Sequence, residues 1–130
     1  MTREELDPNV ATCHCGAVRV HVRKLPRTLT RCDCSICRRY GAVWAYYAAS
    51  SVRVDAPKGG LAKYSWNRRT REYHRCTTCG CVTHYTYRKR PQSTVAVNAS
   101  NFEPTVIYFF RSPVTFHDCL QYGLLSVCLM

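Results

Sequence analysis

The chain has 130 residues, enough for one domain with a hydrophobic core, and we expect a single domain spanning 1–130. It carries 19 Lys and Arg against 8 Asp and Glu, a formal net charge of +11, and it includes ten cysteines. No apolar run is long enough to span a membrane, and the charged start MTREELDPNV lacks the apolar stretch of a signal peptide. We therefore expect a cytoplasmic protein, where closely spaced cysteines are more often metal ligands or catalytic groups than disulfides.

The formal charge overstates how basic the protein is if its cysteines bind zinc. The count treats every thiol as neutral, whereas a zinc ion held by three or four thiolates carries a net negative charge. The remaining excess is still positive, which is compatible with an anionic partner, either nucleic acid or a small substrate with carboxylates.

The N-terminal part predicts a short strand after a first pair of thiols. Residues 1–12 are expected to form a polar lead-in, followed by Cys13 and Cys15. Residues 17–22 alternate apolar and polar side chains, which is typical of a half-buried strand. In an extended chain, residues i and i+2 point to the same face, so the two thiols can approach one ion together. Residues 24–30 predict a loop.

The stretch RCDCSICRR at 31–39 places three thiols within six positions, among three arginines. It leads into an expected short turn or helix, with Ser35 as a candidate cap. Positive charge lowers the pKa of nearby thiols and favours the thiolate, which is the metal-binding and nucleophilic form. Three thiolates are too few for a closed tetrahedral zinc site. Either a distant residue completes the set, or the fourth position is open to water or substrate.

The second half of the chain predicts further short strands and no long helix. A turn is expected over 55–60, where Pro and two Gly lie close together. The chain shows no internal repeat and no low-complexity linker. The fold class is therefore mostly β, with strands expected over the ranges 43–50, 61–66, 68–75, 81–87 and 94–99, and an apolar run over 106–110 that docks on the sheet.

Cys76 and Cys79, followed by Gly80, form a second pair of thiols at a predicted tight turn. Two thiols separated by two residues supply half of a zinc tetrahedron, and glycine permits the backbone conformation that such a turn needs. The CxC pair near the N-terminus would supply the other half. The spacing alone leaves open the alternative that the second pair joins Cys32 and Cys34.

Three motifs resemble the glutathione-dependent formaldehyde-activating enzyme family, which also includes the centromere protein V-like proteins. They are CHCGAV at 13–18, RCDCSICRRYG at 31–41 and CTTCG at 76–80. The resemblance extends over a core of about 13–116. It implies a folded-over β-tent, in which short antiparallel strands are stapled together by zinc.

The resemblance also implies two zinc ions per chain. One is structural, and the second, with an open position, is the reaction centre. The implied activity is that of a carbon–sulfur lyase acting on a thiol adduct such as S-(hydroxymethyl)glutathione, formed from glutathione and formaldehyde. By this resemblance the structural ligands are Cys13, Cys15, Cys76 and Cys79, and the catalytic ligands are Cys32, Cys34 and Cys37.

The other residues that could take part in chemistry are expected to have no direct role as metal ligands. His14 is expected at the surface, and His74 and His84 are expected either to support the second zinc indirectly or to face solvent. Asp33 is expected to contact the backbone or an arginine, and Cys81 to be a small buried residue. The aromatic residues are expected mainly in the core, with some of them lining a pocket: Trp44, Tyr46, Tyr47, Tyr64 and Trp66.

The rival interpretation is a basic zinc protein that contacts nucleic acid or chromatin without catalysis. The basic tracts 68–71 and 88–90, with tyrosines nearby, could bind phosphates, but no base-reading motif accompanies them. A redox or metal-buffering protein is a third alternative. The three cysteine motifs argue against it, because their order indicates permanently bound zinc. The apolar tail 120–130 could pack at a subunit contact in a homodimer, and Cys119 and Cys128 are expected to be plain thiols.

Overall fold

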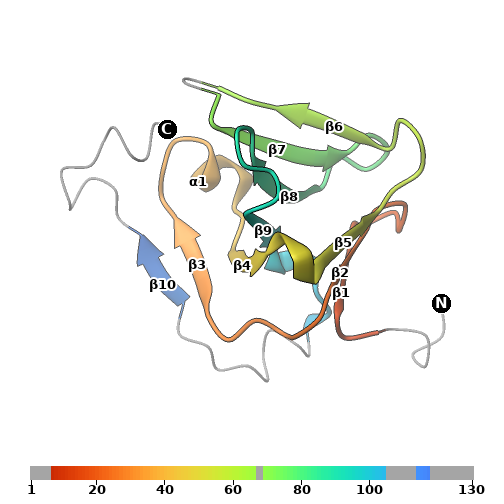
Figure 1. Cartoon of the computed structure of the whole chain (residues 1–130), viewed down its shortest axis with the longest axis horizontal. Coiled ribbons are helices and arrows are strands. Elements are labelled where there is room, and N and C mark those ends of the chain that lie inside the picture. The colour runs from red at the N-terminus through yellow and green to blue at the C-terminus, as the bar shows by residue number, and fades with distance from the viewer. Residues whose placement is uncertain (1–6, 67–68, 105–113, 118–130) are drawn as a thin grey trace.

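The computed structural model describes residues 7–66 and 69–104, together with the backbone of 114–117. Within these residues ten short strands form two sheets (Figure 1). The smaller sheet has the order β1-β2-β5, with bounds Val10–Thr12, Arg19–Val22 and Val52–Asp55. The larger sheet has the order β10-β3-β4-β9-β8-β7-β6, with bounds Val114–His117, Leu29–Cys32, Trp44–Ala48, Thr94–Asn98, Val82–Tyr87, Arg71–Cys76 and Leu61–Tyr64.

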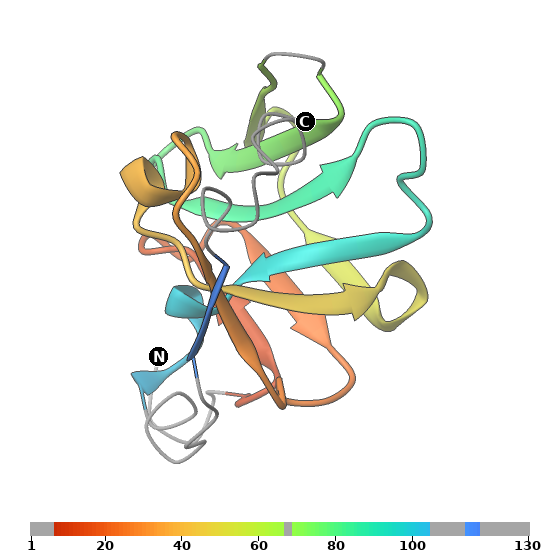
Figure 2. The same cartoon turned by 90° about the vertical axis from the view of Figure 1, so that its left-hand side faces the viewer.

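The fold is mostly β and antiparallel, as the sequence predicts. Figure 2 shows β4, β9, β8 and β7 following one another across the larger sheet, with the short helix α1 (Cys37–Tyr40) at one end of them. The exception to the antiparallel pattern is β10, which pairs in parallel with β3. Two 3-10 turns, Ala49–Ser51 and Ala99–Asn101, follow β4 and β9.

One face of the larger sheet packs against the smaller sheet. Val20 and Val22 of β2 lie in a single apolar cluster with Ala45 of β4 and Val97 of β9, and all four side chains are buried. These positions alternate with more exposed ones along β2, as expected of a strand with one buried face. This cluster forms the main apolar core and holds the two sheets together.

The opposite face of the larger sheet carries an aromatic layer that supports α1. Trp44, Tyr73 and Tyr85 come from β4, β7 and β8, and all three are buried. The ring centroid of Trp44 lies 4.8 Å from that of Tyr85 in an edge-to-face contact, and the Tyr73 and Tyr85 centroids are 5.2 Å apart. Cys37, the first residue of α1, belongs to the same cluster. The loop that carries three thiols is therefore fixed on a rigid aromatic surface.

Several local expectations were wrong. The expected lead-in 1–12 contains strand β1, and the expected loop 24–30 ends inside β3. The three residues of β1 are too few for their alternation to stand out in the sequence. Helix α1 follows Ile36 as its N-cap, and no side chain caps it, so Ser35 does not have the capping role expected of it.

Some expectations fall outside the described residues: the apolar run 106–110, the tail 120–130, and the thiols Cys119 and Cys128. Across the described part of the chain, no helix has the length and apolar character needed to cross a lipid bilayer.

Candidate metal centres

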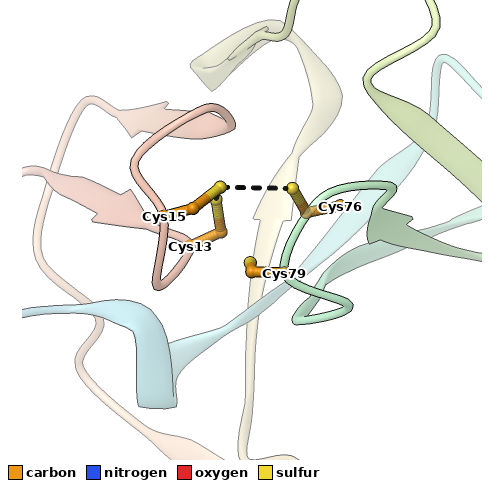
Figure 3. A group of neighbouring side chains, drawn as sticks. All are labelled: Cys13, Cys15, Cys76 and Cys79. Atoms are coloured by element: carbon orange, nitrogen blue, oxygen red, sulfur yellow. Dashed lines mark hydrogen bonds between the residues drawn. The ribbon is translucent and has the colours of Figure 1, made fainter.

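Four cysteine sulfurs converge where the two sheets meet. Cys13 and Cys15 lie in the loop between β1 and β2, and they face Cys76 and Cys79 at the end of β7 (Figure 3). The Sγ atom of Cys15 is 3.6 Å from that of Cys13 and 3.6 Å from that of Cys76, and all four sulfurs lie within 4.8 Å of one another. Sulfurs placed tetrahedrally at a zinc–sulfur distance of 2.3 Å would be about 3.8 Å apart. The observed spacing therefore fits a zinc ion.

The two halves of this four-cysteine cluster have similar backbone turns. The Gly16 N–H donates to the Cys13 carbonyl at 3.0 Å, and the Gly80 N–H donates to the Cys76 carbonyl at 2.9 Å. Both glycines have positive φ, +83° and +78°, a conformation that costs a residue with a side chain about 1–2 kcal/mol. The glycine that follows each cysteine pair therefore lets the chain reverse direction at the sulfurs.

The cluster also joins distant parts of the chain. Cys13 and Cys76 are buried in an apolar cluster with Val18, and Cys81 packs against its edge. A metal ion here would tie the smaller sheet to the end of β7. The alternative in which Cys76 and Cys79 join the 32–34 thiols is excluded by this geometry.

The other three cysteines form a separate cluster on the aromatic face. Cys32 ends β3, Cys34 lies in the following turn, and Cys37 begins α1. Their sulfurs lie within 4.8 Å of one another, and each side chain is at most 7 % exposed. In the described part of the chain, no further Cys, His, Asp or Glu side chain joins this group at the same spacing. The donor set is thus three soft sulfurs, which suits zinc with one position left for another ligand.

The three thiols affect one another's ionisation because they are buried together. Hydrogen bonding from Cys32, and then from Cys37, holds the pKa of Cys34 well below its ordinary value. The same interactions, with burial, raise the pKa of Cys37. Without a bound cation, ionisation of one of the three sulfurs therefore makes ionisation of the others less favourable. A divalent metal would deprotonate coordinating thiols and remove that competition.

Tyr73 is a further residue of this three-cysteine cluster that sequence analysis did not identify. Its hydroxyl oxygen lies 3.9 Å from the Cys37 sulfur, and its ring packs against Trp44. Burial raises the pKa of Tyr73, so the hydroxyl keeps its proton, and either the hydroxyl or the thiol can donate in this contact. The signal that could have revealed it is the i, i+2 spacing of Arg71 and Tyr73, which places both side chains on one face of a strand.

Two cavities of about 310 Å³ each flank the three-cysteine cluster, and Cys32 and Cys37 line both. The loop-side cavity also contains Arg31 and Arg38, two exposed cations of the motif, together with Asp33. The sheet-side cavity is instead lined by β-strand residues, including Trp44, Tyr46, Arg71 and Tyr85. The expectation that some aromatic residues line a pocket is therefore confirmed.

His14 is exposed, as expected, whereas His84 is placed differently from the sequence-based expectation. The rings of His74 and His84 stack with centroids 4.2 Å apart. The two residues pair directly across β7 and β8, on the face opposite Tyr73 and Tyr85. His84 is 3 % exposed, so the expectation of a solvent-facing or zinc-supporting side chain was wrong for it.

The burial of His84 predicts a pH dependence of stability. Burial, with a smaller effect of His74, lowers the pKa of His84 to about 3. The unfolded chain binds a proton at this residue below about pH 6.5, whereas the folded protein does not until about pH 3. The contribution of neutral His84 to the free energy of unfolding is therefore complete above pH 6.5. It decreases as the pH falls, by about 2 kcal/mol at pH 5.

Urea denaturation between pH 7 and pH 5 would measure this dependence, and His84→Gln is the matched control. Acid also releases metal from thiolates, but that effect is common to both proteins. Wild type should therefore lose more unfolding free energy than the variant over this interval. Equal losses of unfolding free energy in the two proteins would show that His84 does not contribute to the pH dependence.

The comparisons with known proteins agree with this arrangement. The family model described as glutathione-dependent formaldehyde-activating enzyme matches residues 9–110. A crystal structure of a Rhodobacter sphaeroides protein, solved as a structural-genomics target, is similar with a TM-score of 0.70 and 35 % sequence identity. The similarity covers 83 % of this chain and 99 % of that one.

Proposed function

The chain belongs to the glutathione-dependent formaldehyde-activating enzyme family, and from that premise we propose that it is a zinc-dependent carbon–sulfur lyase-type enzyme. Its reaction is the reversible addition of a small thiol, glutathione first, to formaldehyde, giving S-(hydroxymethyl)glutathione. The observation that carries this proposal is the cluster of three buried sulfurs from Cys32, Cys34 and Cys37. Two of these cysteines, Cys32 and Cys37, line both cavities, and arginine side chains line each cavity as well. The functional unit in this proposal is one domain over 1–130.

The two cysteine clusters have different roles in this proposal. The four-cysteine cluster provides a complete set of ligands and would hold a structural zinc. The three-cysteine cluster would hold the second zinc, which when bound supplies an open coordination position for a substrate thiolate. The eight cysteines of the described residues are free thiols, so seven of them are available as ligands for the two ions.

The protein's own residues prepare the site for a thiolate. A free thiol with a pKa near 8.5 is about 3 % ionised at neutral pH, so stabilising its ionised form there is worth about 2 kcal/mol. The Tyr73 hydroxyl contacts the Cys37 sulfur and helps to keep it in place. Trp44 and Tyr85 are buried in the same cluster as the three cysteines and form part of the wall of the sheet-side cavity. Holding thiol and aldehyde together in the cavity supplies the remaining acceleration.

The addition step balances without an oxidant or a reductant. The substrate sulfur forms a bond to the aldehyde carbon, the carbon–oxygen double bond becomes single, and the thiol proton reaches the oxygen through solvent. The reverse reaction breaks the same sulfur–carbon bond. Tyr46 is suited to stabilise the charge on that oxygen, because its hydroxyl accepts from Tyr85 at 3.3 Å and its own hydrogen is free to point into the cavity.

Exchange NMR spectroscopy at equilibrium tests this function directly. Formaldehyde reacts with thiols unaided, so the interconversion of glutathione and its hydroxymethyl adduct has a background rate. We expect that rate to rise in proportion to the concentration of zinc-loaded protein, and to remain at background with an equal mass of serum albumin. A rate at background with the zinc-loaded protein would refute the formaldehyde assignment, while the metal sites would stand.

A specific observation supports nucleic-acid contact as the second candidate function. The Arg88 N–H donates to the Thr70 carbonyl at 2.8 Å, which brings the two basic tracts side by side at one end of β7 and β8. Arg69, Arg88, Lys89 and Arg90 are all exposed there.

We predict that any such binding is weak, indifferent to sequence and strongly reduced by salt, because the tracts offer charge and no base-reading element. Fluorescence anisotropy with labelled DNA at 50 and 200 mM salt would measure it. Tight binding at 200 mM salt that is lost in Arg69→Ala/Arg88→Ala would instead support this second function.

A further inference from the structure

Arg71 lies on the face of the sheet that holds the three-cysteine cluster. It is directly opposite Tyr87, and two residues further along each strand Tyr73 is opposite Tyr85. Tyr85 in turn pairs with Ala96 of β9, which pairs with Tyr46 of β4. Directly paired residues in neighbouring strands point to the same face. Strand register therefore brings Arg71 to the same face as residues of β4 and β8.

The sheet-side cavity connects this arginine with the thiols. Arg71 lines the cavity together with Cys32 and Cys37. A volume of about 310 Å³ holds on the order of ten water molecules, since each occupies about 30 Å³ in the liquid. A short thiol that carries a carboxylate has room there to place its sulfur at the cluster and its other end near Arg71.

The surroundings of Arg71 favour an anion. Its guanidinium carbon lies 5.3 Å from the ring centroid of Tyr85 and 5.8 Å from that of Tyr87, so aromatic rings surround it. Among the described residues, the ion pairs involve His21, Arg53 and Lys63, and none places a carboxylate on Arg71. The guanidinium donates to the Tyr73 hydroxyl and keeps further donors for another partner. A partly buried cation with no carboxylate beside it attracts an anion from solution, and a planar guanidinium binds a carboxylate through two parallel hydrogen bonds.

A second polar group adds to this preference. Trp44 also lines the cavity, and its Nε1–H is buried without a hydrogen-bond partner among the described residues. Such a donor gains free energy when an acceptor reaches it. By contrast, the acidic residue Asp33 lines the loop-side cavity together with the two exposed arginines. The sheet-side cavity is therefore the better receptor for an added carboxylate.

We propose that Arg71 binds a carboxylate of the thiol substrate in the sheet-side cavity and thereby selects thiols that carry one. This inference rests on the proposed function, because it requires the substrate sulfur to bind at the three-cysteine cluster. Arg71 is then a specificity-determining residue, separate from the arginines of the RCDCSICRR motif.

Calorimetric titration of the full-length, zinc-loaded protein tests the proposal with two thiols of equal chain length. One is 3-mercaptopropionate, and the other is the neutral 3-mercaptopropanol. In Arg71→Met, the affinity for the carboxylate thiol should fall roughly 10-fold or more, while that for the neutral thiol stays within about twofold. Arg88→Met removes one charge at the same end of the sheet and should leave both affinities unchanged.

The other outcomes are distinguishable. An equal loss for both thiols would mean that Arg71 balances the charge of the cluster, and no loss for either would mean that it does not contact the ligand; both overturn the proposal. If neither thiol binds wild type, the proposed function fails as well. Should Arg71→Met not fold, competition in wild type decides: propionate should displace 3-mercaptopropionate, whereas failure to compete would overturn the proposal.

Discussion

Cys79→Ser should prevent stable folding. The four-cysteine cluster would hold a metal that joins the smaller sheet to the end of β7, and Cys79 supplies one of its sulfurs. The apparent binding free energy of structural zinc is about 10–16 kcal/mol, as large as the whole stability of a typical domain. Replacing one thiolate by a hydroxyl should therefore lower the free energy of unfolding by more than the net stability of the fold. Cys13→Ser should act in the same way.

Circular dichroism and thermal melting of the purified variants would measure this loss. Cys81→Ser is the matched control, because it makes the same chemical change two residues away at a half-buried position whose sulfur is outside the cluster. It should change the unfolding free energy by no more than about 1 kcal/mol. A cooperative melt of Cys79→Ser near the wild-type temperature would contradict the structural role of this cluster.

Cys34→Ser should give the opposite result, a folded protein that has lost its activity. Cys34 lies in a turn beside α1, and the aromatic layer beneath it packs without any contribution from a metal. Removing one of only three sulfurs should release that ion, since no other ligand in the described residues replaces it. The exchange rate between glutathione and its hydroxymethyl adduct should then return to background.

The expected readouts for Cys34→Ser are a wild-type circular dichroism spectrum, about one zinc fewer per chain, and an exchange rate equal to the background rate measured with serum albumin. Cys81→Ser again serves as the control and should keep the wild-type rate. If Cys34→Ser retained the full rate with a reduced zinc content, the chemistry would take place elsewhere on the protein.

The sequence predicted the elements whose patterns are local. Strands β8 and β9 are rich in β-branched and aromatic residues, which favour strands, and the glycine after each cysteine pair indicates a turn. The CxC, CxCxxC and CxxCG spacings predicted two groups of thiols but left their membership open. The resemblance to a family, and not the spacing, gave the correct grouping.

The sequence did not predict the strand register or the face of the sheet on which each side chain lies. Both depend on partner strands far away in the chain. A register shift between His74 and Arg75 interrupts the alternation of β7, so spacing from Cys76 does not tell which face His74 occupies. Arg71 appeared in the sequence as part of a basic tract. Only the pairing of β7 with β8, and of β8 with β9, places it beside the cavity.

One chain is expected to hold two metal ions with different roles, one enclosed by four thiolates and one bound by three thiolates with an open position. Native mass spectrometry of well-folded wild-type protein, purified without chelators, counts the ions directly. We expect a chain mass increased by two zinc ions. A well-folded chain that carries a single zinc ion would contradict it.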